Sequence, residues 1–173
     1  MTPPPVALGI LDHLPQAVTV VDAEGRLAYA NPAFLQAVGV AADACPPGMP
    51  LEQLVRLLAY RGFYGAGDPE TQIAAVLAMD RSRPSRRQIG LADGSRSFDT
   101  ASLPLPGGGF LSVAHDITAL LRAREEQAAR ARLLEGTLAR LNDGVARFDA
   151  EMRLGLINPA YEELLGLPGG TPR

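Results

Sequence analysis

The sequence predicts an α+β domain, in which a five-stranded antiparallel sheet carries helices on one face and leads into a long helix. Two observations predict this class. Short apolar runs bounded by turn residues lie near both ends of residues 1–118, and the stretch between them has apolar residues at helical spacing. Residues 120–141 are dense in Ala, Arg, Glu and Leu and contain no proline. The expected order is strand, strand, helices, three strands and a long helix.

The first half of this domain is defined by caps and turns. Asn31 is a good helix N-cap, Pro32 suits the first helical position, and Gly39 suits a helix end. Asp68-Pro69 repeats the pattern before a second apolar helical run. The expected elements are a leading helix at 6–13, strands at 17–22 and 26–30, and helices at 32–38, 51–61 and 68–83.

Three further strands are expected after these helices, at 86–91, 96–103 and 110–115. The turn ADGS at 92–95 is a strong hairpin signal, and three glycines at 107–109 mark the next turn. Those glycines join two strands and lack the spacing of a phosphate-binding loop, so a turn role is predicted.

A long linker helix is predicted from its composition and spacing. Positions alternating by three and four form a candidate coiled-coil seam, apolar at both ends and polar at Arg124 and Gln127. Two interpretations stay open, a parallel dimeric seam and a solvated spacer helix. The seam positions are Ile117, Leu120, Arg124, Gln127, Ala131, Leu134, Leu138 and Leu141.

A repeat links the two ends of the chain. Residues 22–34, DAEGRLAYANPAF, return as 149–161, DAEMRLGLINPAY, at a constant offset of 127 positions. A period this long indicates tandem domains. Gly25 favours positive φ whereas Met152 does not, so the second turn is expected to differ in type from the first.

The order of these pieces resembles the PAS domain, a small sensory module of bacterial signalling proteins. The resemblance is carried by residues 18–22, 26–34, 92–95, 106–110 and 116–118, and residues 61–70 resemble a subgroup at the front of multi-PAS sensor histidine kinases. It implies a PAS domain at 6–118, a signalling helix at 119–141 and the truncated start of a second PAS domain at 142–173.

Composition narrows the class of protein. A net charge of −3 argues against general nucleic-acid binding, and 47% hydrophobic with 20% charged residues fits a globular chain. The single Cys45 excludes an internal disulfide and fits a reducing compartment. No apolar run reaches the roughly 20 residues of a membrane helix, and no signal peptide is recognisable. A cytoplasmic location without membrane contact is expected for this fragment.

No catalytic function is predicted. The two histidines, His13 and His115, lie in no metal-binding or phosphoacceptor pattern, and no nucleophile, metal set or nucleotide loop is found. The PAS resemblance implies that haem needs a histidine on helix 68–83, which has none, and that flavin photochemistry needs a cysteine motif that Cys45 does not provide. No cofactor is therefore predicted, and two alternatives stay open: an unidentified small-molecule ligand or no ligand at all.

The resemblance places a ligand cavity between the sheet and the middle helices. Aromatic residues with a polar tip can both pack and bind a ligand, and the alternative is that they only fill the core. Arg56, Arg61, Arg86 and Arg87 are interpreted as a solvated face in preference to an anion site. The candidate pocket residues are Tyr29, Phe34, Leu58, Phe63, Tyr64, Ile73, Leu77, Ile89 and Phe98.

Taken together, the sequence predicts a sensory and dimerisation module of a two-component signalling protein. A change in the first domain would pass through Asp116, Ile117 and Thr118 into the linker helix, where Arg124 and Gln127 allow two registers. The expected partners are a second copy of the chain and downstream PAS or kinase domains of the same protein. The alternative is a ligand-free spacer or protein-docking module.

Overall fold

The computed structural model describes residues 9–166 of the 173-residue chain. It divides into two compact units, Met1–Ala119 and Leu120–Arg173, and the division falls within the first turn of the long helix. The predicted leading helix is helical at residues 9–11, and its earlier part lies outside the described residues.

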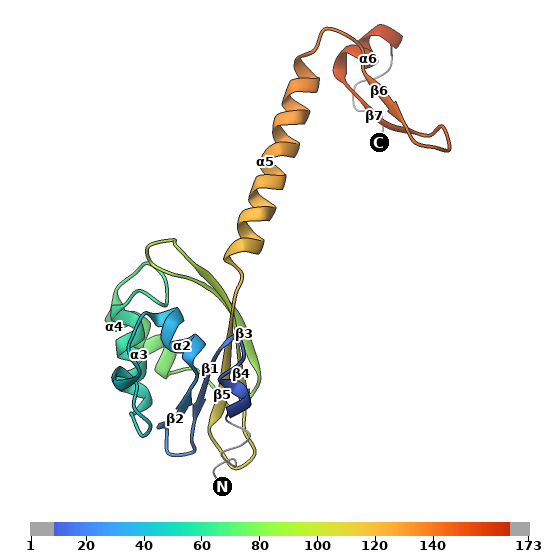
Figure 1. Cartoon of the computed structure of the whole chain (residues 1–173). Coiled ribbons are helices and arrows are strands. Elements are labelled where there is room, and N and C mark those ends of the chain that lie inside the picture. The colour runs from blue at the N-terminus through green and yellow to red at the C-terminus, as the bar shows by residue number, and fades with distance from the viewer. Residues whose placement is uncertain (1–8, 167–173) are drawn as a thin grey trace. The chain divides into compact units, whose positions relative to one another are not determined.

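The first unit contains a five-stranded antiparallel sheet in the order β2-β1-β5-β4-β3 (Figure 1). Every strand predicted for this unit is present. Because β1 pairs with β5, the two strands from the start of the unit lie beside the three strands from its end. The predicted fold class is therefore confirmed. The strands are β1 (Ala17–Val21), β2 (Leu27–Ala30), β3 (Ser85–Gly90), β4 (Ser97–Pro104) and β5 (Phe110–Asp116).

Three helices cover one face of this sheet: α2 (Pro32–Val38), α3 (Leu51–Tyr60) and α4 (Pro69–Leu77) (Figure 1). The side chains of Asn31 and Asp68 accept hydrogen bonds from the backbone N–H groups of Phe34 and Thr71, which caps α2 and α4 as predicted. A short 3₁₀ turn, η1 (Ala42–Ala44), lies in the proline-rich loop between α2 and α3.

Helix α4 ends six residues before the predicted end at Arg83. The guanidinium of Arg81 folds back and donates hydrogen bonds to the backbone carbonyls of Val76 (2.5 Å), Leu77 and Met79. These carbonyls lie in the last turn of α4 and just beyond it, so Arg81 supplies donors where the helix ends. The sequence carries no local signal for this side-chain contact, and the prediction extended the helix to residue 83.

The core of the first unit lies between the sheet and the helices. The aromatic rings of Phe63 and Phe98 stack with their centroids 5.4 Å apart, and both side chains are buried. Burial of apolar area is the main favourable term for a domain of this size. The central cluster also contains Leu27, Phe34, Leu54, Leu58 and Ile89.

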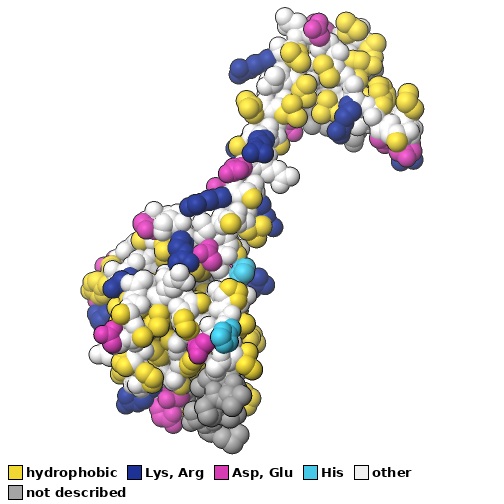
Figure 2. Space-filling model, viewed as in Figure 1, with side chains coloured by type: hydrophobic (Ala, Val, Ile, Leu, Met, Phe, Trp, Pro, Cys, Tyr) yellow, Lys and Arg dark blue, Asp and Glu magenta, His cyan; other side chains and the backbone are white. Residues whose placement is uncertain are grey.

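The second unit contains most of α5 (Thr118–Arg140), a hairpin of β6 (Ala146–Phe148) and β7 (Leu154–Ile157), and α6 (Pro159–Leu165). No residue of α5 is buried. Basic and acidic side chains are interspersed along it, with apolar ones between them, on the face shown in Figure 2. Ile117 precedes the helix and is buried in the first unit, so it does not belong to an exposed seam, contrary to the prediction.

The turn of the second hairpin has the same conformation as that of the first, contrary to the prediction. Met152 has φ +62° where Gly25 has φ +73°. In both turns the aspartate carboxylate accepts two backbone hydrogen bonds, Asp22 from Glu24 and Arg26, and Asp149 from Glu151 and Arg153. These bonds hold Met152 in a left-handed conformation that its side chain disfavours.

Candidate functional site

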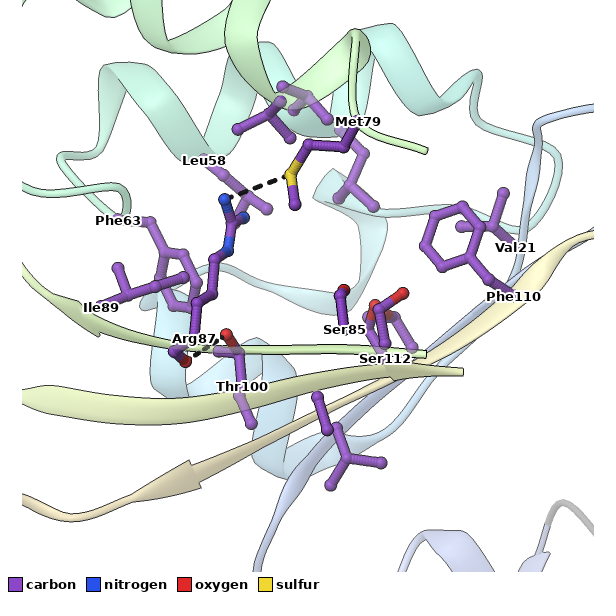
Figure 3. A pocket seen from close by; sticks show the side chains of 18 of the residues that line it. Val21, Leu58, Phe63, Met79, Ser85, Arg87, Ile89, Thr100, Phe110 and Ser112 are labelled. Atoms are coloured by element: carbon purple, nitrogen blue, oxygen red, sulfur yellow. Dashed lines mark hydrogen bonds between the residues drawn. The ribbon is translucent and has the colours of Figure 1, made fainter. Parts of the chain in front are cut away.

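A cavity of about 120 Å³ lies between the sheet and helices α3 and α4 (Figure 3). Its helical side is apolar, built from Leu51, Leu54, Val55, Leu58 and Val76. Strands β1, β3, β4 and β5 form its floor. A volume of this size holds several water molecules or a small ligand and is well below the roughly 300 Å³ at which drug-sized sites begin.

Five of the nine predicted pocket residues line this cavity: Phe34, Leu58, Phe63, Tyr64 and Ile89. Phe98 is buried behind Phe63 and forms part of the core that supports the wall. Ile73 and Leu77 instead pack with Val76 in a separate apolar cluster between α3 and α4.

Tyr29 lies on the opposite face of the sheet. It pairs with Val20, whereas Thr19 and Val21 line the cavity, and successive strand residues point to opposite faces. Because a bulge shifts the register between Val20 and Val21, Leu27 pairs with Val21 and takes the position on the cavity side of the sheet that Tyr29 does not occupy. The Tyr29 hydroxyl donates to Asp12 at 2.5 Å, and burial together with this hydrogen bond raises the pKa of Tyr29 to about 12.

The glycine-rich loop at 62–67 places two aromatic rings at one end of the cavity. The backbone N–H of Phe63 donates to the carbonyl of Leu58, and the carbonyl of Gly62 accepts from Ala92 in the β3–β4 turn. Gly62 has φ +71°, and a Cβ there would lie 2.7 Å from that of Ala92, so a larger residue would displace the loop. Phe63 and Tyr64 meet edge to face, and burial raises the pKa of Tyr64 to about 12.

A row of four hydroxyl residues crosses the floor of the cavity. Ser85 pairs with Ser102, Ser102 with Ser112, and Ser112 with Thr19, so the row spans β3, β4, β5 and β1. All four line the cavity, and Figure 3 shows Ser85 and Ser112 at its floor. The sequence prediction missed them because only strand register brings such residues into one row.

Of the four arginines considered from the sequence, one reaches the cavity. Arg56 pairs with Glu70, Arg61 donates to the carbonyl of Gly39, and Arg86 pairs with Asp99 on the outer face of the sheet. Arg87 crosses the space between sheet and helices, with its Nη1 3.3 Å from the sulfur of Met79 (Figure 3). Its guanidinium also lies 5.6 Å from the centre of the Tyr64 ring, a cation–π distance.

A polar network joins the sheet to the start of α5. The Asp116 carboxylate accepts hydrogen bonds from the backbone N–H and the hydroxyl of Thr118 and from Arg96. Burial raises the pKa of Asp116, but these hydrogen bonds and the Arg96 charge outweigh it and hold the pKa below its ordinary value. Ile117 and Thr118 both bond to the backbone of Ser97 on β4.

Arg96 completes this network, although the sequence prediction did not single it out. Its guanidinium pairs with Asp116, lies 4.9 Å from the centre of the Phe98 ring and donates to the carbonyl of Ala37 at the end of α2. It therefore contacts the core, a helix and the junction with α5. The signal in the sequence was only its place after the ADGS turn.

Other features of the described residues bear on chemistry. Cys45 is buried in the core outside the cavity, and burial raises the pKa of its thiol. Within residues 9–166 no group of three His, Cys, Asp or Glu side chains could hold a metal ion. In the same range no helix combines the length and apolar character needed to span a membrane.

Comparison with known proteins agrees with this geometry. Residues 11–126 match the model of a family described as PAS fold. The chain is 34% identical over 158 residues to the sensor protein DivL of Caulobacter vibrioides. This match covers 88% of this chain and 20% of DivL. The chain thus spans about a fifth of the length of that relative.

Two solved PAS domains are among the structures similar to this chain. The PAS domain of BvgS from Bordetella pertussis has a TM-score of 0.47 and 24% identity, covering 72% of this chain and 96% of that one. The PAS domain of a protein from Colwellia psychrerythraea has a TM-score of 0.45 and 19% identity, covering 66% and 96%. With its sheet order, helical layer and match over residues 11–126, the chain belongs to the PAS fold family.

Proposed function

We propose that this chain is a sensory module of a bacterial signal-transduction protein. A small ligand in the cavity changes the first unit, and the change passes through the junction at Asp116, Ile117 and Thr118 into α5. The observation that carries the proposal is a pair of hydrogen bonds between the Ser97 backbone and the junction. This residue precedes Phe98 on β4, and its backbone bonds to both Ile117 and Thr118.

The path between the two sites is short and made of packed groups. Phe63 lines the cavity and stacks on Phe98, and the Arg96 guanidinium lies over Phe98 and pairs with Asp116. A ligand that moves Phe63 therefore acts on the residues that fix the first turn of α5. A change of state also requires two arrangements of the receiving element.

The receiving element in this proposal is a parallel dimer of α5. Leu120, Leu134 and Leu141 expose 51%, 60% and 41% of their surface, which leaves them open to a second copy. Arg124 and Gln127 between them weaken the seam and permit two registers. The second unit, which repeats the opening elements of the first, is the start of the next PAS domain and receives the signal.

The alternative function is a spacer or docking module that binds no ligand. The observation in its favour is the density of the core around Phe98, which is 1% exposed. The hydroxyl row argues against this alternative. Burying hydroxyl groups without hydrogen-bond partners costs free energy, and apolar side chains would fill the same space without that cost.

Native mass spectrometry of the purified chain tests the proposal, because it reports stoichiometry and retained ligand together. A dimer that carries added mass, lost in the cavity-filling variant Ser112→Leu, supports the sensory function. A chain that remains monomeric at tens of micromolar and gains no mass from cell extract contradicts it and favours the spacer.

A further inference from the structure

We propose that the cavity recognises a small organic carboxylate, whose charged end binds Arg87 and whose polar groups bind the hydroxyl row. This inference rests on the proposed ligand-binding function and names the class of ligand. Three observations carry it: the four hydroxyl groups lack hydrogen bonds within the protein, the charged residues around the cavity are basic, and the cavity is small.

The hydroxyl row has hydrogen-bonding capacity that the protein does not use. Within the part of the chain that the structure describes, the side chains of Thr19, Ser85, Ser102 and Ser112 form no hydrogen bond. Thr100, on the neighbouring row, does bond, to the carbonyl of Arg87. Covering a hydroxyl with an apolar group costs about 1–3 kcal/mol. A ligand that fills the cavity must therefore offer polar atoms along the floor.

The charge around the cavity is positive. Its described lining includes Arg81 and Arg87 and no acidic residue. Arg81 is already committed to three backbone carbonyls and stacks on the Phe110 ring, so it contributes charge but few free donors. An anion between the sheet and α4 would be attracted by both guanidinium groups.

Arg87 is the group able to bind that anion directly. Its neighbour Arg86 pairs with Asp99, Arg56 with Glu70 and Arg96 with Asp116. Arg87 instead contacts the Met79 sulfur, a weak acceptor, and the face of Tyr64. A carboxylate is a far stronger partner for the planar guanidinium, which can bind it through two parallel hydrogen bonds.

The size and roof of the cavity limit the carboxylate. A volume of about 120 Å³ excludes nucleotides, haem and flavin, and the apolar roof of Leu54, Leu58 and Val76 favours a short carbon chain. The geometry therefore points to a short-chain carboxylic acid with a hydroxyl or a second carboxyl group that reaches Ser102 and Ser112.

The test is an NMR titration of the ¹⁵N-labelled chain with malate, succinate and lactate, and with succinamide as an uncharged analogue. At least one acid is expected to shift the amides of Thr19, Ser102 and Ser112 at millimolar concentration. Arg87→Met should weaken binding at least tenfold, whereas Arg86→Met, one residue away on the outer face, should change it less than twofold. Ser112→Ala, a smaller change within the floor, should weaken it severalfold.

Three outcomes overturn the inference. Equal binding of succinamide and succinate would show that charge is not recognised. Equal effects of Arg86→Met and Arg87→Met, in variants that melt like the wild type, would exclude a specific role of Arg87. If no acid binds while an apolar or cationic compound from cell extract is retained with the chain, the ligand class is wrong although the sensory function stands.

Discussion

Asn31 and Asn158 make the same four hydrogen bonds in two parts of the chain 127 positions apart. The Oδ1 atom of Asn31 accepts from the backbone N–H groups of Val18 and Phe34, and its Nδ2 donates to the carbonyls of Leu11 and Gln16. For Asn158 the partners are Val145, Tyr161, Leu138 and Asp143, each at the same offset. One amide thus ties a strand, a helix start and the preceding segment together.

Loss of this amide should destabilise each unit separately. Asn31 is fully buried, and Asn31→Ala removes all four side-chain hydrogen bonds and leaves the Val18 N–H without its partner, which should lower the free energy of unfolding of the first unit by about 3 kcal/mol. Asn158→Ala should leave that transition unchanged, because Asn158 belongs to the second unit. Urea unfolding followed by circular dichroism measures both. A loss below about 1 kcal/mol for Asn31→Ala would contradict this account.

The paired turns offer a reciprocal test of backbone strain. Gly25→Ala should cost about 1 kcal/mol, because φ is +73° there and a Cβ would meet nothing within 4 Å, so only the backbone opposes it. Met152→Gly should protect the amides of the β6–β7 hairpin from hydrogen exchange, since it removes the same strain from the second turn. Faster exchange in Met152→Gly would mean that its side chain stabilises the turn.

The Asp116 network should make stability depend on pH. Its folded pKa lies below the unfolded value of about 3.9, so its contribution is complete well above that value and is lost as the pH falls through the folded pKa. Asp116→Asn should cost about 1 kcal/mol at pH 7, because Asp116 and Arg96 are partly exposed, and less at pH 3, where protonation has begun to remove the contribution of the carboxylate.

Urea unfolding at the two pH values measures this difference. The exposed Asp43 on η1 provides the control Asp43→Asn, which should change stability by less than about 0.3 kcal/mol at either pH. The same cost for Asp116→Asn at pH 7 and pH 3 would show that the carboxylate charge does not hold the junction.

The seam of α5 can be strengthened selectively. Leucine at both Arg124 and Gln127 should lower the concentration at half dimerisation at least tenfold, because it makes the middle of the seam apolar. The control places leucine at Ala129 and Arg132, off the seam, with the same number of leucines and the same loss of charge. Analytical ultracentrifugation compares the two, and equal effects would show that the seam is misplaced.

The sequence predicted the elements well because their signals are local. Asn31-Pro32, Asp68-Pro69 and Gly39 each define a helix boundary through one residue's own chemistry, and the structure has those boundaries. The end of α4 depends on Arg81 reaching back four and five residues, and the turn at Met152 depends on the Asp149 carboxylate. Hydrogen bonds of this kind, between a side chain and nearby backbone groups, leave no periodic pattern in the sequence.

The candidate site was harder to predict for a related reason. Phe63, Tyr64 and Ile89 were found because large apolar residues beside a glycine-rich loop are expected in a core. Tyr29 was misplaced because a one-residue bulge decides which face it occupies. The hydroxyl row depends on the register of four strands from both ends of the domain, which no local pattern encodes.

The most direct test of the sensory function is hydrogen exchange at the start of α5 when the cavity is filled from within. Ser112→Leu places a leucine in the cavity, and Gln88→Leu places the same residue on the exposed outer face of β3. The proposal predicts that Ser112→Leu changes exchange at residues 117–124 at least threefold and that Gln88→Leu does not. Unchanged exchange in a stably folded Ser112→Leu would contradict coupling between the cavity and the helix.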